Sequence, residues 1–237
     1  MSTRDSVSLA LAPMLLRAVL SLTFVWAGLG KLLAEMPVKG ENAALLANMG
    51  VGAVQTKAAS GGAAAAATGA TAASFTPSDF PEEIRVARLY GLALLVKSSS
   101  VASADSKLGF PLLPAAVGEG AWPVRMAWAA ALTELVAGLL VLFGLLTRLS
   151  ALSLAGVMLV AIWLTEIGPA LVSGQTMLAF LPAREAFDVN AWKTLLWQFS
   201  LLGSALALTL IGAGGLSMDR AMSARPIVSK PKPATGG

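Results

Sequence analysis

The sequence predicts an all-α membrane protein, a four-transmembrane-helix bundle with a long, partly helical extracytoplasmic insertion between helices 1 and 2. Of its 237 residues, 56% are hydrophobic and 13% are charged, whereas an average soluble domain carries about 25% charged residues. The chain also holds apolar runs that reach the roughly 20 residues needed to cross a bilayer. In lipid such runs must be helical, because every backbone polar group needs a partner within the segment.

The apolar runs divide the chain into four parts. The expected spans are residues 11–33, 124–146, 149–171 and 192–214. The division is then residues 1–34 (N-terminus and first helix), 35–121 (insertion), 122–214 (helices two to four) and 215–237 (an amphipathic or disordered tail). A very short link around Thr147 and Arg148 makes the second and third spans antiparallel neighbours.

The charges at the ends of the spans and beyond them are unevenly distributed. With four spans, both termini lie on one side of the membrane, and the acids on that side are only Asp5 and Asp219. The bases on the same side are Arg4, Arg17, Arg148, Arg220, Arg225, Lys230 and Lys232. The positive-inside rule therefore predicts that both termini are cytoplasmic.

The segment between the first two spans is far longer than an ordinary helix connection. It is expected to include a helix over the apolar stretch IRVARLYGLALLVK, residues 84–97, which is too short to span a membrane. Two interpretations stay open: the helix is a lid over this chain's own bundle, or it docks another protein subunit. The docking residues would be Ile84, Leu89, Tyr90 and Leu94.

The chain contains no Cys and no His. Haem, iron–sulfur, zinc and copper centres depend mainly on these residues. We therefore expect no metal cofactor, and a redox role would rest on an organic carrier such as a quinone or on a partner protein.

One carboxyl group, Glu134, falls near the middle of the second span. A charge at the bilayer centre costs at least about 2.5 kcal/mol, so it needs a partner or a role. Lys31 is the expected partner, because its long side chain can adjust its depth. With Glu166 and Gln198 the two define an expected polar intramembrane layer. It either fixes helix register or lines a pocket for a quinone or a lipid.

Helical spacing also predicts which face of the first span is internal. Arg17, Ser21, Phe24, Gly28 and Lys31 recur every three or four residues and so share one stripe. Lys31 and Glu134 are therefore expected to meet inside the bundle, while Arg17 is interpreted as an anchor at the membrane surface.

Three stretches resemble the DoxX family of small bacterial membrane proteins, which is related to the membrane subunits of thiosulfate:quinone oxidoreductase. They are LLRAVLSLTFVWAGLGKLL from Leu15, ELVAGLLVLFGLLTRLSAL from Glu134, and GAGGLSMDRAM from Gly212. The resemblance implies a four-helix bundle in the bacterial inner membrane. Its recurrent polar residues match Arg17, Lys31, Glu134, Arg148 and Asp219.

Two features depart from the family pattern: the long segment before residue 122, and Glu166 where many relatives place a histidine. The functional hypothesis is an accessory subunit of a larger redox or energy-transducing membrane complex. It would be a scaffold that contacts lipid or quinone, docks other subunits through residues 35–121 and binds no nucleic acid. The alternative is a thiosulfate:quinone oxidoreductase-type enzyme subunit that binds its anion through Lys31 and Arg85 or Arg88. A transporter is disfavoured, because nothing indicates inverted repeats.

Overall fold

A computed structural model describes residues 3–60, 74–102, 106–214 and 217–223 of the chain. It is mostly helical, and four of its helical segments are long and apolar enough to cross a membrane. These candidate spans are Leu11–Leu33, Trp122–Phe143, Thr147–Ser173 and Val189–Ile211. The coarse prediction of a multi-pass helical membrane protein is confirmed, whereas the tail from Arg225 lies outside the described residues.

The four spans are built from six helical elements. The first lies in α1 (Thr3–Leu33) and the second is α5 (Trp122–Phe143). The third combines α6 (Thr147–Ile162), a π-helical turn η4 (Trp163–Ile167) and α7 (Gly168–Ser173). The fourth is α8 (Val189–Ile211).

The turn between α5 and α6 comes earlier than predicted. Gly144 ends α5 in the left-handed region at φ 68°, and Leu146 follows at φ 46°. A glycine just past the last helical residue is a common way to end a helix, because it adopts this conformation without steric cost. Thr147 and Arg148, expected in the link, therefore already belong to α6.

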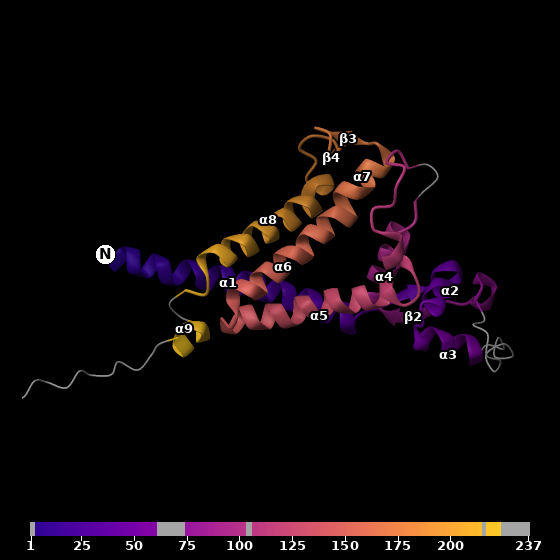
Figure 1. Ribbon diagram of the computed structural model, residues 1–237, viewed down its shortest axis with the longest axis horizontal. Helices are drawn as coiled ribbons and strands as arrows, with labels where there is room; N and C mark the ends of the chain where they lie inside the picture. Colours follow the sequence, from indigo (N-terminus) through magenta and orange to yellow (C-terminus); the bar gives the residue numbers. More distant parts are fainter. Residues whose placement is uncertain (1–2, 61–73, 103–105, 215–216, 224–237) are drawn as a thin grey trace, which may run out of the picture.

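The spans form two antiparallel pairs, α1 with α5 and α6 with α8 (Figure 1). The pairs meet at the end of the molecule that holds the N-terminus, the α5–α6 turn and the short helix α9 (Met218–Ser223). They diverge toward the opposite end, where α4 (Leu89–Ser99) lies beside α5. All four helices contribute to one core, which includes Leu20, Phe24, Val141, Leu154 and Leu208.

Glycines bring α1 and α5 together. A Cβ atom added at Gly28 would lie 3.0 Å from the backbone nitrogen of Leu135, and one at Gly138 would lie 3.2 Å from that of Val25. The buried face of α1 carries Arg17, Ser21, Phe24 and Gly28, as the spacing predicted. Small residues at such positions let helix backbones approach closely in lipid, where packing rather than the hydrophobic effect drives association.

The segment between α1 and α5 forms a second packed layer. Its strands β1 (Glu35–Val38) and β2 (Ile84–Ala87) pair antiparallel, with Met36 opposite Val86. The helices α2 (Gly40–Asn48), α3 (Gly52–Ser60) and α4 surround them, with short 3-10 turns at Pro77–Asp79 and Ala115–Gly118. This layer has its own core, which also takes in Ala127 of α5.

Two expectations for this segment need correction. The helix expected over residues 84–97 begins only at Leu89, because Ile84 and Val86 alternate with exposed Arg85 and pair with β1 as a strand. Of the expected docking residues, Ile84 and Leu89 are buried in the chain's own core, while Tyr90 and Leu94 are half-buried against it. The segment packs against α5 of its own bundle.

The close approach of α1 and α5 predicts a strong asymmetry between two glycines. Gly28→Leu should lower the free energy of unfolding by about 1–3 kcal/mol, because the added atoms have no space against Leu135. Gly203 of α8 is the matched control: it is exposed and has no atom within 4 Å of an added Cβ. Gly203→Leu should change stability by at most about 0.5 kcal/mol. Denaturant unfolding in detergent measures both, and equal losses would contradict the observed packing.

Candidate functional site

Lys31 and Glu134 form an ion pair between α1 and α5. The Lys31 Nζ donates to Glu134 Oε2, and the side chains of Lys31 and Glu134 are 22% and 4% exposed. Glu134 follows Ala131 on the buried face of α5, one helical turn before Gly138. The interaction expected from the sequence is thus present, at the interface between α1 and α5.

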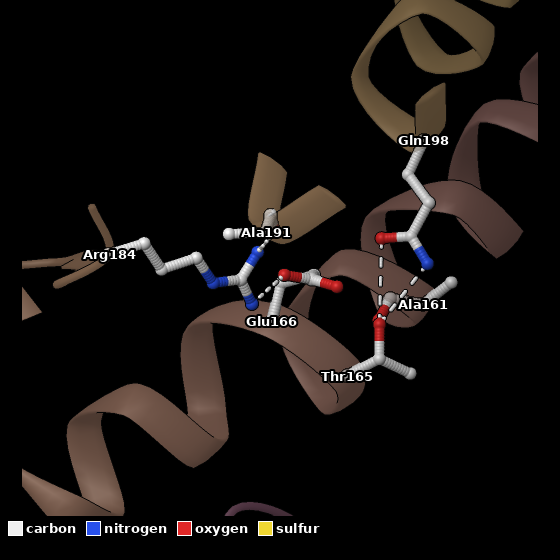
Figure 2. Close-up of polar contacts among 6 residues, drawn as sticks. All are labelled: Ala161, Thr165, Glu166, Arg184, Ala191 and Gln198. Atoms are coloured by element: carbon white, nitrogen blue, oxygen red, sulfur yellow. Dashed lines mark hydrogen bonds and ion pairs between the residues drawn. The ribbon is translucent and has the colours of Figure 1, made fainter. Parts of the chain in front are cut away.

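Glu166 makes a different ion pair. It lies in the π-helical turn η4 and is 5% exposed. Arg184, in the segment between α7 and α8, donates from Nη2 to Glu166 Oε2 at 2.5 Å and from Nη1 to the Ala191 carbonyl oxygen at 2.5 Å (Figure 2). Arg184 therefore joins the end of the third span to the start of the fourth.

Gln198 lies on α8 and bonds to the same π-helical turn. Its Nε2 donates to Thr165 Oγ1 at 3.1 Å, and Thr165 in turn donates to the Ala161 carbonyl oxygen at 2.9 Å (Figure 2). The four polar side chains expected in one layer make two separate sets of contacts. Lys31 and Glu134 join α1 to α5, whereas Glu166 and Gln198 hold the far end of the α6–α8 pair.

The π-helical turn itself follows from the residues around it. Pro169 has no N–H group, so it cannot donate an α-helical bond to the carbonyl of Thr165. The helix widens over Trp163–Ile167, and the Gly168 N–H bonds to the Trp163 carbonyl oxygen five residues back. Single π-helical turns of this kind are frequent at functional sites.

A cavity of about 240 Å³ lies beside this turn, between the end of α4, the segment 106–112 and α7. Leu95, Phe110, Leu112, Leu164 and Val172 give it apolar walls, and Ser98, Ser99 and Ser106 add hydroxyl groups. The indole of Trp163 donates to the Leu112 carbonyl oxygen at 3.1 Å and so ties the segment 106–112 to the third span. The volume exceeds the roughly 150 Å³ that accommodates benzene in an engineered protein cavity.

The family-matched residues Arg17, Arg148 and Asp219 gather at the other end of the bundle. Arg17 is 6% exposed, and its guanidinium donates to the carbonyl oxygens of Val141 at 2.9 Å and Leu142 at 2.7 Å. These carbonyls belong to the last turn of α5, where backbone acceptors lack helical partners. Arg17 was interpreted as a surface anchor. It is instead buried and caps the end of α5.

Asp219 caps the beginning of α6. Its carboxylate accepts hydrogen bonds from the backbone N–H of Leu146 at 2.8 Å and of Thr147 at 3.0 Å, and from the Thr147 hydroxyl at 3.0 Å. Arg148, the residue after Thr147, is exposed. Its Nε would lie 3.1 Å from a Cβ atom added at Gly212, so the arginine side chain passes close to this glycine. Arg17 and Asp219 thus bond to backbone groups on either side of the α5–α6 turn.

The environment of Asp219 shifts its titration. Burial acts to raise the pKa of this carboxyl group, but the bonds donated by Thr147 and Leu146 and the nearby Arg17 charge outweigh it. The pKa of Asp219 is therefore lowered from its ordinary value, as expected for a carboxylate held by several N–H donors.

Two of these partnerships were missed by sequence reasoning. Arg184 lies outside the spans, and its spacing carries no periodicity that links it to Glu166. Asp219 was recognised only through the family resemblance, and its role as a helix cap depends on a contact over 72 residues of sequence. Across the described parts of the chain, no group of Asp or Glu side chains could hold a metal ion.

The lowered pKa of Asp219 predicts an acid-sensitive contribution to stability. Because the folded pKa lies below the unfolded value of about 3.9, the contribution is present above that pH and is lost as pH falls through the folded pKa. Asp219→Asn should therefore be less stable than the wild type at pH 7, and the difference should shrink below about pH 4. Unfolding in detergent across pH 3–7 measures it. A difference that stays constant down to pH 3 would contradict this assignment.

Comparison with known families identifies the central part of the chain. The DoxX family model matches residues 88–167, about a third of the sequence. The match includes Glu134, Arg148 and Glu166, and it begins within the segment 35–121 that was expected to be an insertion, so α4 belongs to the family-like part. Comparison with curated proteins and with solved structures gives no match. The resemblance found in the sequence is confirmed over this segment: residues 88–167 carry a DoxX domain, consistent with a DoxX-family membrane protein.

Proposed function

We propose that the chain is an integral membrane accessory subunit of a larger redox or energy-transducing complex, where it acts as a scaffold and contacts lipid or quinone. The observation that supports this most is the state of its buried charges. Among the described residues the buried ionisable side chains are Arg17, Glu134 and Glu166, and each bonds to a group of the chain itself. Their geometry serves to join helices.

The position of the ion pairs supports a scaffolding role. Glu134 with Lys31 joins α1 to α5, and Glu166 with Arg184 joins the third span to the fourth. Breaking such a buried pair at one side costs about 3–5 kcal/mol, so each is a strong constraint on helix position. A catalytic carboxyl group would instead be expected to face a substrate-sized space.

The layer between α1 and α5 supports a docking role, but through residues other than those expected from the sequence. Its own core holds β1, β2 and α2–α4 together, so its outer surface is formed before any partner binds. Glu82, Glu83, Arg85 and Arg88 are exposed there. We propose that these charges, rather than the buried Ile84 and Leu89, face the partner subunit, since paired charges at an interface give specificity and orientation.

The cavity beside the π-helical turn supports contact with an uncharged carrier. Its apolar walls and serine hydroxyl groups fit a ring that carries oxygen acceptors, and the Trp163 bond to the Leu112 carbonyl gives it a fixed wall. When bound, a quinone would supply the electron-transfer chemistry. The residues of this chain would orient the ring and exclude water.

The proposed location is the inner membrane of a bacterium, with both termini in the cytoplasm. The end of the bundle that holds the α5–α6 turn and α9 carries Arg17, Arg148 and Arg220 against the acid Asp219. This excess of basic residues supports the orientation through the positive-inside rule.

The alternative is an enzyme subunit of the thiosulfate:quinone oxidoreductase type. Arg85 and Arg88 are both exposed near the diverging ends of the helix pairs and are suited to attract an anion. Lys31, the third expected anion ligand, is committed to Glu134. This interpretation therefore depends on the two arginines and predicts thiosulfate-dependent quinone reduction by the isolated chain.

The accessory-subunit proposal predicts a stable large assembly. After gentle solubilisation of native membranes and native electrophoresis, the chain should comigrate with other subunits, which mass spectrometry identifies. Arg85→Glu combined with Arg88→Glu should weaken comigration, because both changes reverse charge on the proposed docking surface. Arg220→Glu, an exposed arginine of α9 at the opposite end, is the matched control and should retain it.

Two results would overturn the proposal. A free monomer or homodimer in every mild detergent would contradict membership of a complex. Reduction of a short-chain quinone by the isolated chain with thiosulfate would favour the enzyme alternative, and loss of that activity in the Arg85 and Arg88 variant would locate the anion site.

A further inference from the structure

The segment between α7 and α8, residues 174–188, presents large apolar side chains to the outside. Leu178 is 73% exposed, Phe180 is 53% exposed and Phe187 is 98% exposed. The first two lie at and near the tip of a small hairpin formed by β3 (Thr176–Met177) and β4 (Leu181–Pro182). Phe187 precedes Asp188, which caps α8 by accepting the Asn190 N–H at 2.9 Å.

The backbone holds these side chains in unusual positions. Leu178, Ala179 and Phe187 have φ angles of 51°, 71° and 67°. Hairpin turns with positive φ normally use Asn, Asp or Gly, because a bulky side chain is disfavoured there. Leu and Phe at such positions indicate that the apolar side chain itself serves a purpose that outweighs the strain.

The segment is also held firmly to the bundle. Arg184 bonds to both Glu166 and the Ala191 carbonyl oxygen (Figure 2), and the Ala183 N–H donates to the Gln175 carbonyl oxygen at 2.9 Å. The Trp192 indole donates to the Glu185 carbonyl oxygen at 2.9 Å. The exposed apolar side chains therefore project from a fixed frame.

The position of residues 174–188 between two spans indicates what their exposed apolar side chains contact. The segment connects two candidate spans, Thr147–Ser173 and Val189–Ile211, so its ends must lie where the hydrocarbon of a bilayer gives way to head groups. Apolar side chains on a surface element at this depth gain free energy by entering the boundary of the acyl chains. Glu185 and Asp188, which are exposed within the same segment, suit the polar side of that boundary.

We infer that residues 174–188 form a rigid lipid anchor. Leu178, Phe180 and Phe187 insert into the interfacial layer of the bilayer at the end of the bundle opposite the α5–α6 turn, and they fix the depth of α7 and α8. Because Arg184 connects the frame to Glu166, the anchor also sets the depth of the π-helical turn.

The absence of cysteine from the whole sequence permits a clean test. Single cysteines replace Leu178, Phe187, Glu185 or Leu22 in the full chain, and each is labelled with a nitroxide. Leu22 is 74% exposed near the middle of the first span and serves as the lipid reference, while Glu185 serves as the aqueous reference. Vesicles of phosphatidylcholine and phosphatidylglycerol hold the labelled protein, and collision rates with oxygen and with a water-soluble nickel chelate are measured.

At positions 178 and 187, the oxygen-to-nickel collision ratio should be several-fold higher than at position 185 and should stay below that at position 22, because the ratio rises toward the bilayer centre. A ratio equal to that at position 185 would overturn the inference, because it would place the side chains in water. Labels that are immobilised and shielded from both reagents would also overturn it, because another protein or a second copy would then cover this face. All four replaced side chains are exposed, so a single symmetric peak in size exclusion confirms folding of each variant before the collision rates are compared.

Discussion

The ion pair of Lys31 and Glu134 is the constraint on which the helix arrangement depends. A carboxyl group near the middle of a span is tolerated only with a partner, and its partner here stands on the first span of the chain. The two side chains can meet only if α1 and α5 face each other in one rotation and one register. Gly28 and Gly138 on the same faces leave the space for that approach.

The two ends of the bundle are held by different sets of contacts. At the end that holds the α5–α6 turn and α9, Arg17 and Asp219 satisfy backbone groups on either side of that turn. Each of these backbone groups thereby gains a hydrogen-bond partner, and so avoids the cost of a buried polar group without one. At the opposite end the pairs diverge, α4 packs beside α5, and Arg184 closes the second pair. The cavity lies at this diverging end, between α4 and the third span.

The positions of the spans and the internal face of α1 could be predicted from the sequence, because each depends on a local pattern of residues. Length and hydropathy located the four spans, and the three-to-four-residue rhythm of Arg17, Ser21, Phe24 and Gly28 identified the internal face of α1. The pairing of Lys31 with Glu134 followed because few partners in the chain suit a carboxyl group at that depth. The end of α5 was misplaced by three residues, because Gly144 was read as part of the span.

Other features depend on contacts that no local pattern carries. Similar depth in the membrane suggested one layer for Glu134, Glu166 and Gln198, but depth alone does not bring helices together when the pairs diverge. Ile84 and Val86 form a strand because β1 lies beside them, and the strand comes 46 residues after Val38 along the chain. Arg184 reaches Glu166 because the segment between α7 and α8 folds back on the third span. The sequence of that segment has no feature that distinguishes it from an ordinary loop.

The most direct test of the central claim is a double-mutant cycle on the ion pair. Lys31→Met, Glu134→Gln and the combined variant are compared with the wild type by denaturant unfolding in detergent. If the pair locks α1 to α5, each single change is strongly destabilising, and the combined loss is smaller than the sum of the single losses by at least about 1 kcal/mol. Losses that simply add would show that the two side chains do not stabilise each other, and would contradict the account.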